Sequence, residues 1–191
     1  LYHKERNKNM SKAYLFLATG FEEVEALTVV DILRRGGVDC KTVSVMDDYD
    51  VTSSHTVTVR ADLLFDEQDL SDGDMLILPG GIPGTPNLKA HKGLEKLILQ
   101  YREEGKYLAA VCAAPTIYGE MGLLEGKNAT CYPGMEEGLH GANHLTDKVV
   151  WDGQFITSRG MGTCIDFGLT LLARLTSEEN ADEVAHKIVY R

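Results

Sequence analysis

The sequence predicts an α/β domain built on a mainly parallel β-sheet. Short apolar segments typical of buried strands alternate along the chain with longer segments whose apolar residues recur at helical spacing. Such alternation is typical of β–α–β units, in which a helix connects two parallel strands. The 191 residues are enough for one such domain with its own core. We therefore predict a single domain over residues 13–191, and we expect the polar N-terminal extension, residues 1–12, to be disordered or peripheral.

The first half of the chain contains the clearest helix and strand signals. Ala26, Val29 and Leu33 share one helical face, and Gly36-Gly37 ends that helix. The apolar runs before and after it have the length and composition of strands buried on both faces. The expected elements are a strand over 13–19, a helix over 22–35, a strand over 39–46, one or two short strands or a hairpin over 51–60, a strand over 74–78 and a helix over 88–104.

The second half repeats the pattern around a cysteine. Asp152-Gly153 is typical of a hairpin turn, and Ser177, followed by two glutamates, is typical of a helix N-cap. The segment 134–147 is polar, rich in glycine and unassigned. The expected elements are a strand over 107–111, a helix from 115 to about 121, a short strand over 129–132, a hairpin over 149–158, a helix from 160 to about 175 and a helix from 177 to about 189.

Composition narrows the possible partners. A formal net charge of −10 disfavours nucleic acids and anionic membranes, because both repel an acidic surface. No apolar run approaches the length that spans a bilayer, and residues 1–12 lack the apolar core of a secretory signal. We therefore expect a cytoplasmic protein with no membrane and no nucleic-acid partner. Its four cysteines are widely spaced without a CxxC pair, so we expect free thiols rather than disulfides.

The stretch around Cys112 predicts a nucleophile elbow. A buried strand ends at this cysteine, and Pro115 suits the first turn of the helix that follows. Ala110 and Ala114 stand where a sharp strand-to-helix turn has no room for larger side chains. The start of the helix directs N–H groups and the positive end of its dipole at the sulfur, which predicts a lowered thiol pKa. The alternative is a small cysteine packed in an α/β core.

Other segments follow strands of the same predicted sheet. Gly20–Glu25 and Pro79–Gly81 come directly after buried strands, and sites in parallel sheets lie beyond the carboxyl ends of the strands. Among the glutamates that open the first helix, Glu25 shares a side with the apolar face and is the candidate to turn inward and move protons. For its neighbours Glu22 and Glu23, stabilisation of the helix start is a sufficient explanation.

An oxyanion hole can be built at the same edge. The Gly80-Gly81 turn and the amide of Ala113 at the helix start supply backbone N–H donors. The alternative, which we weigh equally, is that the two glycines are present only because the turn is tight. No histidine partner for the thiol is evident. His140 and His144 are four residues apart in a glycine-rich segment with no acidic ligand pattern, so a solvated loop is favoured over a metal site, and we expect no metal.

These motifs together resemble the ThiJ/PfpI superfamily, and within it the branch of the Parkinsonism-associated deglycase and its bacterial relatives. The matching pieces, in order, are Gly20–Glu25, Leu78–Gly81, Ala110–Pro115 and Thr157–Thr163. The resemblance implies a flavodoxin-like three-layer sandwich related to class I glutamine amidotransferases. It also implies a homodimer with sites near the interface and no metal or organic cofactor.

The resemblance assigns roles residue by residue. Cys112 matches the nucleophilic, oxidation-prone cysteine, Glu25 the glutamate that hydrogen-bonds its sulfur, and Gly81 and Ala113 the oxyanion positions. Three departures matter. Ala113 replaces the histidine that follows the cysteine in protease-like members, Tyr132 stands before Pro133 where better-known eukaryotic relatives have a histidine, and Met161 replaces the proline of the last motif. Tyr132 is therefore a candidate auxiliary group.

Two functions follow from the same residues. The first is a cofactor-independent glyoxalase or deglycase that acts on α-oxoaldehydes such as methylglyoxal, or on their protein adducts, through a hemithioacetal at Cys112. The second is an oxidative-stress sensor and chaperone in which Cys112 is oxidised. An intracellular cysteine peptidase ranks lower because Cys112 lacks a histidine partner. A role in thiazole-monophosphate biosynthesis ranks lower because no phosphate or thiazole site is evident.

Overall fold

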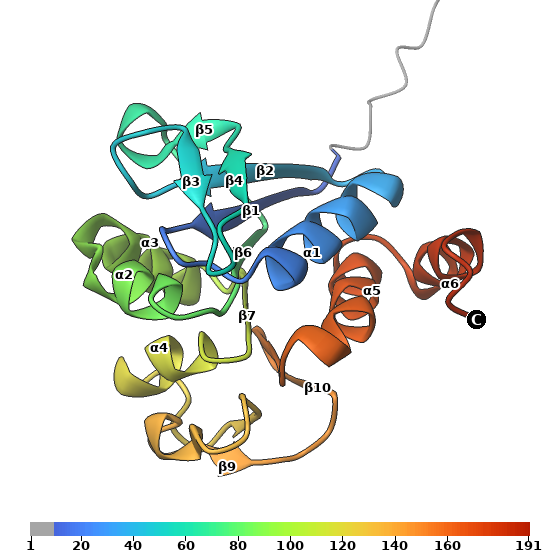
Figure 1. Ribbon diagram of the computed structural model, residues 1–191. Coiled ribbons are helices and arrows are strands. Elements are labelled where there is room, and N and C mark those ends of the chain that lie inside the picture. Colours follow the sequence, from blue (N-terminus) through green and yellow to red (C-terminus); the bar gives the residue numbers. More distant parts are fainter. Residues whose placement is uncertain (1–9) are drawn as a thin grey trace, which may run out of the picture.

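A central seven-stranded sheet organises the computed structural model, which describes residues 10–191 (Figure 1). Every strand pair in this sheet is parallel except β10–β11 at one edge. The α/β class and the mainly parallel sheet are thus confirmed. In spatial order the strands are β10 (Val149–Asp152), β11 (Phe155–Ser158), β7 (Tyr107–Val111), β6 (Met75–Leu78), β1 (Lys12–Leu17), β2 (Asp39–Ser44) and β5 (Leu63–Leu64).

Helices cover both faces of the sheet, which gives the three layers of the expected sandwich. Side chains of β1 alternate between two cores: Ala13, Leu15 and Leu17 face one, and Tyr14 and Phe16 face the other. The first core is closed by α1 (Glu23–Arg35), α5 (Cys164–Leu175) and α6 (Glu178–Lys187). The second is closed by α2 (Gly84–Ala90), α3 (Lys92–Glu103) and α4 (Pro115–Glu120).

Short elements complete the chain and include both predicted hairpins. The segment 51–60 forms a small antiparallel sheet of β3 (Asp50–Thr52) and β4 (Thr58–Arg60), and β10–β11 is the hairpin predicted around residue 153. In the segment left unassigned, β9 (Asn143–His144) pairs with β8 (Asn128–Ala129). Three 3-10 turns are η1 (Phe65–Glu67), η2 (Glu136–Gly138) and η3 (Met161–Thr163).

Two sequence predictions need correction. The helix expected over 88–104 is two helices, because the chain turns at His91, whose Nδ1 accepts the N–H of Leu94 at 3.0 Å and caps α3. The strand expected over 129–132 is limited to β8: after Ala129, whose carbonyl accepts the N–H of Leu145 at 2.9 Å, the chain leaves β9, and the N–H of Tyr132 donates instead to the carbonyl of Cys112 at 2.8 Å. The predicted cap at Ser177 is confirmed: its hydroxyl accepts the N–H of Asn180 at 3.1 Å.

The domain begins close to the predicted boundary between the N-terminal extension and the first strand. Most of the expected extension, residues 1–9, lies outside them, and Lys12 already belongs to β1. Among residues 10–191, no helix has the length and apolar character needed to cross a membrane.

Candidate active site

Cys112 stands at the turn between β7 and α4, in a backbone conformation that few side chains adopt. Its φ is +64°, in the left-handed region, which costs roughly 1–2 kcal/mol for a residue other than glycine. Hydrogen bonds on both sides hold this conformation: its N–H donates to the carbonyl of Ser158 at 3.0 Å, and its carbonyl accepts the N–H of Tyr132 at 2.8 Å. The predicted elbow is therefore present, with its sulfur-bearing residue only partly buried.

The helix after the elbow is fixed to the strand before it. The Tyr118 hydroxyl donates to the carbonyl of Ala109 at 3.0 Å, and the Thr116 hydroxyl donates to that of Ala113 at 2.6 Å. Both bonds are buried, and Ala110 and Ala114 have no exposed surface. The small residues around Cys112 thus let α4 start directly against β7, as the sequence predicted.

Glu25 points into the protein from the first turn of α1. The Glu22 carboxylate caps this helix by accepting the N–H of Glu25 at 2.7 Å, while the Glu25 side chain is only 1% exposed. Its Oε1 accepts the N–H of Gly80 at 3.0 Å. Its Oε2 is buried without a hydrogen-bond partner among the described residues. Helical periodicity thus selected the glutamate that faces inward.

Gly80 brings Glu25 and Cys112 together. A β-carbon at Gly80 would lie 2.6 Å from Cβ of Cys112 and 2.7 Å from Oε1 of Glu25, so the two side chains are neighbours across the position that glycine leaves empty. Gly81 has a φ of +96°, and a β-carbon there would lie 2.4 Å from the backbone nitrogen of Glu22. Both glycines are therefore required by close approach, in addition to the tight turn they make.

The electrostatics of this pair differ from the expectation at the thiol but not at the carboxyl. Burial raises the pKa of Glu25 to about 7, and the charge of Glu22 adds to the rise. Burial and the charge of Glu25 raise the pKa of Cys112 to about 12, and the N–H groups of Ala113 and Gly81 lower it by less. The lowered thiol pKa predicted from the helix start is therefore wrong, because desolvation and a neighbouring carboxylate outweigh two backbone donors.

The pKa of Glu25 determines what the pair can do. Near neutral pH its carboxyl is present in both protonation states, which is what a general acid and base requires. When protonated, its Oε2 becomes a donor, and the carboxylate charge that disfavours a Cys112 thiolate disappears. A proton on Glu25 and a negative charge on Cys112 are therefore mutually stabilising.

The remaining candidates are Tyr132, which contacts the elbow, and the two histidines, which belong to other segments. Tyr132 is 51% exposed and meets Cys112 through its backbone; a β-carbon at Gly160 would lie 3.6 Å from its ring. His140 follows η2 on the surface and His144 belongs to β9. In the described part of the chain, the three donors close enough to hold an ion together are those of Glu22, Glu23 and His55, and His55 is already paired with Glu23 at 3.0 Å.

Sequence reasoning missed two contacts. Gly80 was considered as part of a tight turn and as a source of oxyanion donors but not as a contact of Glu25, although its N–H donates to Glu25 at 3.0 Å and its carbonyl accepts the N–H of Glu22 at 2.9 Å. The signal that could have indicated these contacts is that Gly80, which has no side chain, follows a strand at the same sheet edge as Glu25 and Cys112. The hairpin at β3–β4 was not associated with the site, yet the N–H of Ser54 at its tip donates to Phe21 at 2.8 Å, directly before α1.

Residues 11–174 match the DJ-1/PfpI family. The chain belongs to this family. It is 40% identical over 187 residues to protein DJ-1 homolog B of Arabidopsis thaliana, covering 97% of this chain but 43% of that protein. It is 35% identical over 179 residues to protein dj-1beta of Drosophila melanogaster, covering 92% and 96%. The chain thus spans less than half of the Arabidopsis relative and nearly all of the Drosophila one.

Solved structures of DJ-1/PfpI proteins have the same fold. A mutant of a DJ-1 superfamily protein from Salmonella typhimurium superposes with a TM-score of 0.91 at 33% identity, covering 95% of this chain and all of that one. Toxoplasma gondii DJ-1, described as oxidized, superposes with a TM-score of 0.90 at 30% identity, covering 94% and 98%. A Pyrococcus abyssi relative named a deglycase is 29% identical over 153 residues, covering 79% of this chain and 91% of its own.

Proposed function

We propose that the chain is a cysteine-dependent glyoxalase or deglycase that acts on α-oxoaldehydes such as methylglyoxal, or on their adducts with proteins. The observation that carries this proposal is the buried Glu25 carboxyl placed beside Cys112 across Gly80, with a pKa of about 7. A thiol beside a group that is half protonated near neutral pH has both the nucleophile and the proton carrier that this chemistry needs. The name of the Pyrococcus relative agrees with the proposal.

The proposed reaction starts with addition. The sulfur of Cys112 forms a bond to the aldehyde carbon while the thiol proton passes to Glu25 and on to the carbonyl oxygen, giving a hemithioacetal. Glu25 then removes the proton from this carbon and returns it to the adjacent carbon, so the former aldehyde carbon is oxidised to a thioester and the ketone carbon is reduced to an alcohol. Water cleaves the thioester, which releases the hydroxy acid and restores the thiol. The sum is methylglyoxal plus water giving lactate and a proton.

Backbone donors are suited to the charged intermediates. The N–H groups of Gly81 and Ala113 interact with the Cys112 sulfur, so they also lie beside the carbon that would bond to it. Tyr132, exposed above the same turn, is the candidate auxiliary residue at the mouth of the site. These steps use only groups of the chain and water, so we propose no metal and no organic cofactor.

Lactate formation from methylglyoxal, without glutathione or added metal, tests the proposal. The parent chain should form lactate, whereas Cys112→Ser and Glu25→Gln should lower kcat/KM by about 100-fold or more. Glu23→Gln is the matched control, because this glutamate lies in the same turn of α1 but faces His55 at the surface. Lactate from Cys112→Ser at the parent rate, or none from the parent, would contradict the proposal.

A second function is favoured by the accessibility of the same thiol. Cys112 is partly exposed whereas Cys40, Cys131 and Cys164 are buried, so we propose it as the site of oxidation in a stress sensor and chaperone. The sulfur would attack hydrogen peroxide, the O–O bond would break, and Glu25 would supply a proton so that water leaves and a sulfenic acid remains. Intact mass after peroxide treatment should show oxidation in the parent and none in Cys112→Ser. In Glu25→Gln oxidation should persist in part, because an amide donor can still stabilise the oxidised sulfur.

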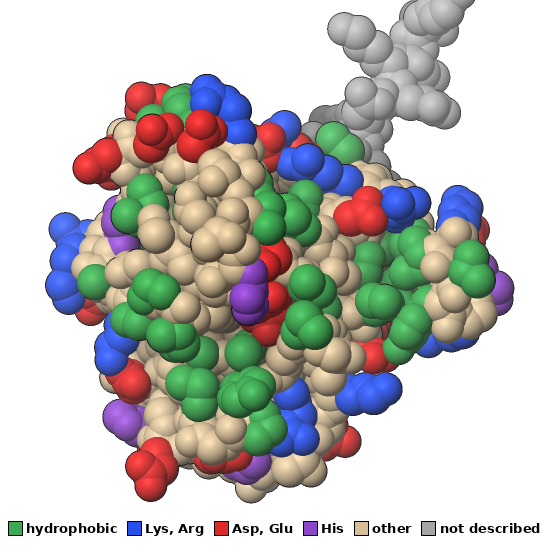
Figure 2. Space-filling view, viewed as in Figure 1, with side chains coloured by type: hydrophobic (Ala, Val, Ile, Leu, Met, Phe, Trp, Pro, Cys, Tyr) green, Lys and Arg blue, Asp and Glu red, His purple; other side chains and the backbone are tan. Residues whose placement is uncertain are grey.

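We also propose a homodimer with the site near its interface. Hydrophobic side chains are exposed around the mouth of the site: Val24 and Leu27 on one face of α1, Val57 at the hairpin tip, and Ile82 and Met161. Figure 2 shows hydrophobic side chains spread around a central group of acidic and histidine side chains. Hydrophobic side chains exposed together on one face of a protein are typical of interaction sites. Sedimentation should give a dimer for the parent and a monomer for Leu27→Asp, and a monomeric parent would overturn the proposed dimer. We propose separately that the protein is cytoplasmic.

A further inference from the structure

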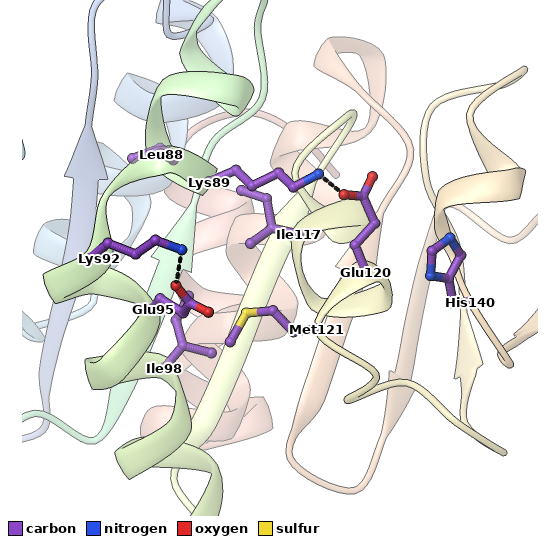
Figure 3. Close-up of a pocket in the computed structure, with 9 residues that line it drawn as sticks. All are labelled: Leu88, Lys89, Lys92, Glu95, Ile98, Ile117, Glu120, Met121 and His140. Atoms are coloured by element: carbon purple, nitrogen blue, oxygen red, sulfur yellow. Dashed lines mark hydrogen bonds and ion pairs between the residues drawn. The ribbon is translucent and has the colours of Figure 1, made fainter.

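A hollow lies away from the thiol, between the two helices that precede β7 and the helix that follows it (Figure 3). This inter-helix cavity has a volume of about 370 Å³. Its apolar walls are Leu88 of α2, Ile98 of α3, Ile117 of α4 and Met121 at the end of α4. None of the candidate residues of the thiol site lines it, so any ligand bound here is separate from the proposed reaction.

The apolar part of the inter-helix cavity, here called its floor, consists of Leu88, Ile98, Ile117 and Met121, which belong to the packed core between the helices. Leu88, Ile98 and Ile117 are each almost fully buried, and in Figure 3 Met121 points from α4 toward Ile98. The end of η2 and the residues that follow it pack against α4 because Gly119 leaves room for them: a β-carbon at Gly119 would lie 2.2 Å from the carbonyl oxygen of Gly138 and 2.7 Å from Cα of Leu139. Small-molecule sites typically have this combination of an apolar floor and a few polar groups.

Charged side chains border the cavity and are already arranged in pairs. Lys89 is paired with Glu120, which joins α2 to α4, and Lys92 is paired with Glu95 at 2.8 Å (Figure 3). His140 also lines the cavity, and its side chain has no hydrogen-bond or ion-pair partner within residues 10–191. The border therefore holds three basic side chains against two carboxylates, both of which already have a partner.

We propose that the inter-helix cavity binds a linear medium-chain monocarboxylate, with its alkyl chain on the apolar floor and its carboxylate at Lys89 and Lys92. Each ammonium group has three N–H donors and is paired with one glutamate, so it can donate to a second carboxylate without losing the first. His140 adds a third basic side chain that no carboxylate of the border holds, so an anionic head group finds a donor that is not yet taken. The volume lies near the lower end of small-molecule sites, which suits one short chain better than a nucleotide.

A chain-length series measured by NMR tests the proposal on the full chain. Hexanoate, octanoate and decanoate are titrated into protein labelled at isoleucine and methionine methyl groups. Shifts should concentrate at Ile98, Ile117 and Met121, and Kd should fall about fourfold for each added methylene until the floor is covered, because each buried methylene contributes about 0.8 kcal/mol. Octanol and octylammonium should bind more weakly than octanoate.

Variants locate the carboxylate and separate this site from the thiol. Lys92→Gln should weaken octanoate binding by about three- to fivefold, the effect of losing one exposed charge pair. Lys96→Gln, on the same helix but outside the cavity, and Cys112→Ser should leave Kd unchanged. The proposal is overturned if the shifts lie elsewhere, if Kd does not depend on chain length, if octanol binds as well as octanoate, or if Lys96→Gln weakens binding as much as Lys92→Gln.

Discussion

Replacing the buried Glu25 carboxyl by an amide should stabilise the protein, and increasingly so as the pH rises. The pKa of Glu25 is raised from 4.5 to about 7 in the folded chain. The unfolded chain therefore releases this proton near pH 4.5, while the folded chain holds it until about pH 7. Stability contributed by this group is fully present below pH 4.5, falls as the pH rises to about 7, and stays low above it.

The magnitude follows from the same two values. A pKa difference of roughly 2.5, at about 1.4 kcal/mol for each pKa unit, corresponds to a penalty of about 3 kcal/mol above pH 7. The side chain is 1% exposed, so solvent screens little of this cost. Glutamine keeps the carbonyl oxygen that accepts the N–H of Gly80 and cannot ionise, so Glu25→Gln should lack the penalty.

Urea unfolding between about pH 5.5 and pH 8.5 measures the effect. Over this interval the free energy of unfolding of Glu25→Gln, relative to the parent, should rise by about 2 kcal/mol, because the penalty grows from about 1 to about 3 kcal/mol. Glu137→Gln, which changes an exposed glutamate, controls for a general effect of charge. A difference that does not change with pH, or one that favours the parent at high pH, would refute the reasoning.

Three further substitutions test the geometry of the site and of the helix that precedes it. Gly80→Ala should destabilise by about 1–3 kcal/mol and slow alkylation of Cys112, because a β-carbon would lie 2.6 Å from Cβ of Cys112; unchanged urea unfolding would contradict this. Cys112→Gly should be more stable than Cys112→Ala by about 1 kcal/mol in thermal unfolding, because a φ of +64° strains alanine and suits glycine; the reverse order would show that the strain is absent. His91→Ala should cost about 1 kcal/mol and His91→Asn less, because asparagine can also cap α3; equal losses in denaturant unfolding would speak against the cap.

Much of the fold follows from short-range patterns. The apolar residues of β1 occur in consecutive positions because that strand is buried on both faces, and the alternation of strands and helices predicted the parallel sheet. Glu25 was placed inward by periodicity alone, since it shares a helix face with Ala26 and Val29. The break at His91 was missed because its cap depends on the orientation of one imidazole, which contacts the ring of Phe65 with centroids 4.6 Å apart.

What escaped the sequence depends on contacts between distant segments. The raised pKa of Cys112 results from burial and from Glu25, 87 positions earlier in the chain, so the local helix start gave the wrong sign. Gly80 became significant only when two side chains from α1 and the elbow met at its empty position. The inter-helix cavity likewise depends on α2, α3 and α4 packing together, and no local pattern marks it.

The pKa of the Glu25 carboxyl tests the central claim most directly, because the proposed proton transfer depends on it. A carbon-detected NMR titration of protein labelled at the glutamate side chains would follow this carboxyl in the parent, with Glu25→Gln used to assign its signal. The account predicts a midpoint near pH 7. A midpoint near pH 4.5, the value of an ordinary glutamate, would mean that Glu25 is fully ionised beside Cys112 and is no carrier of protons at neutral pH.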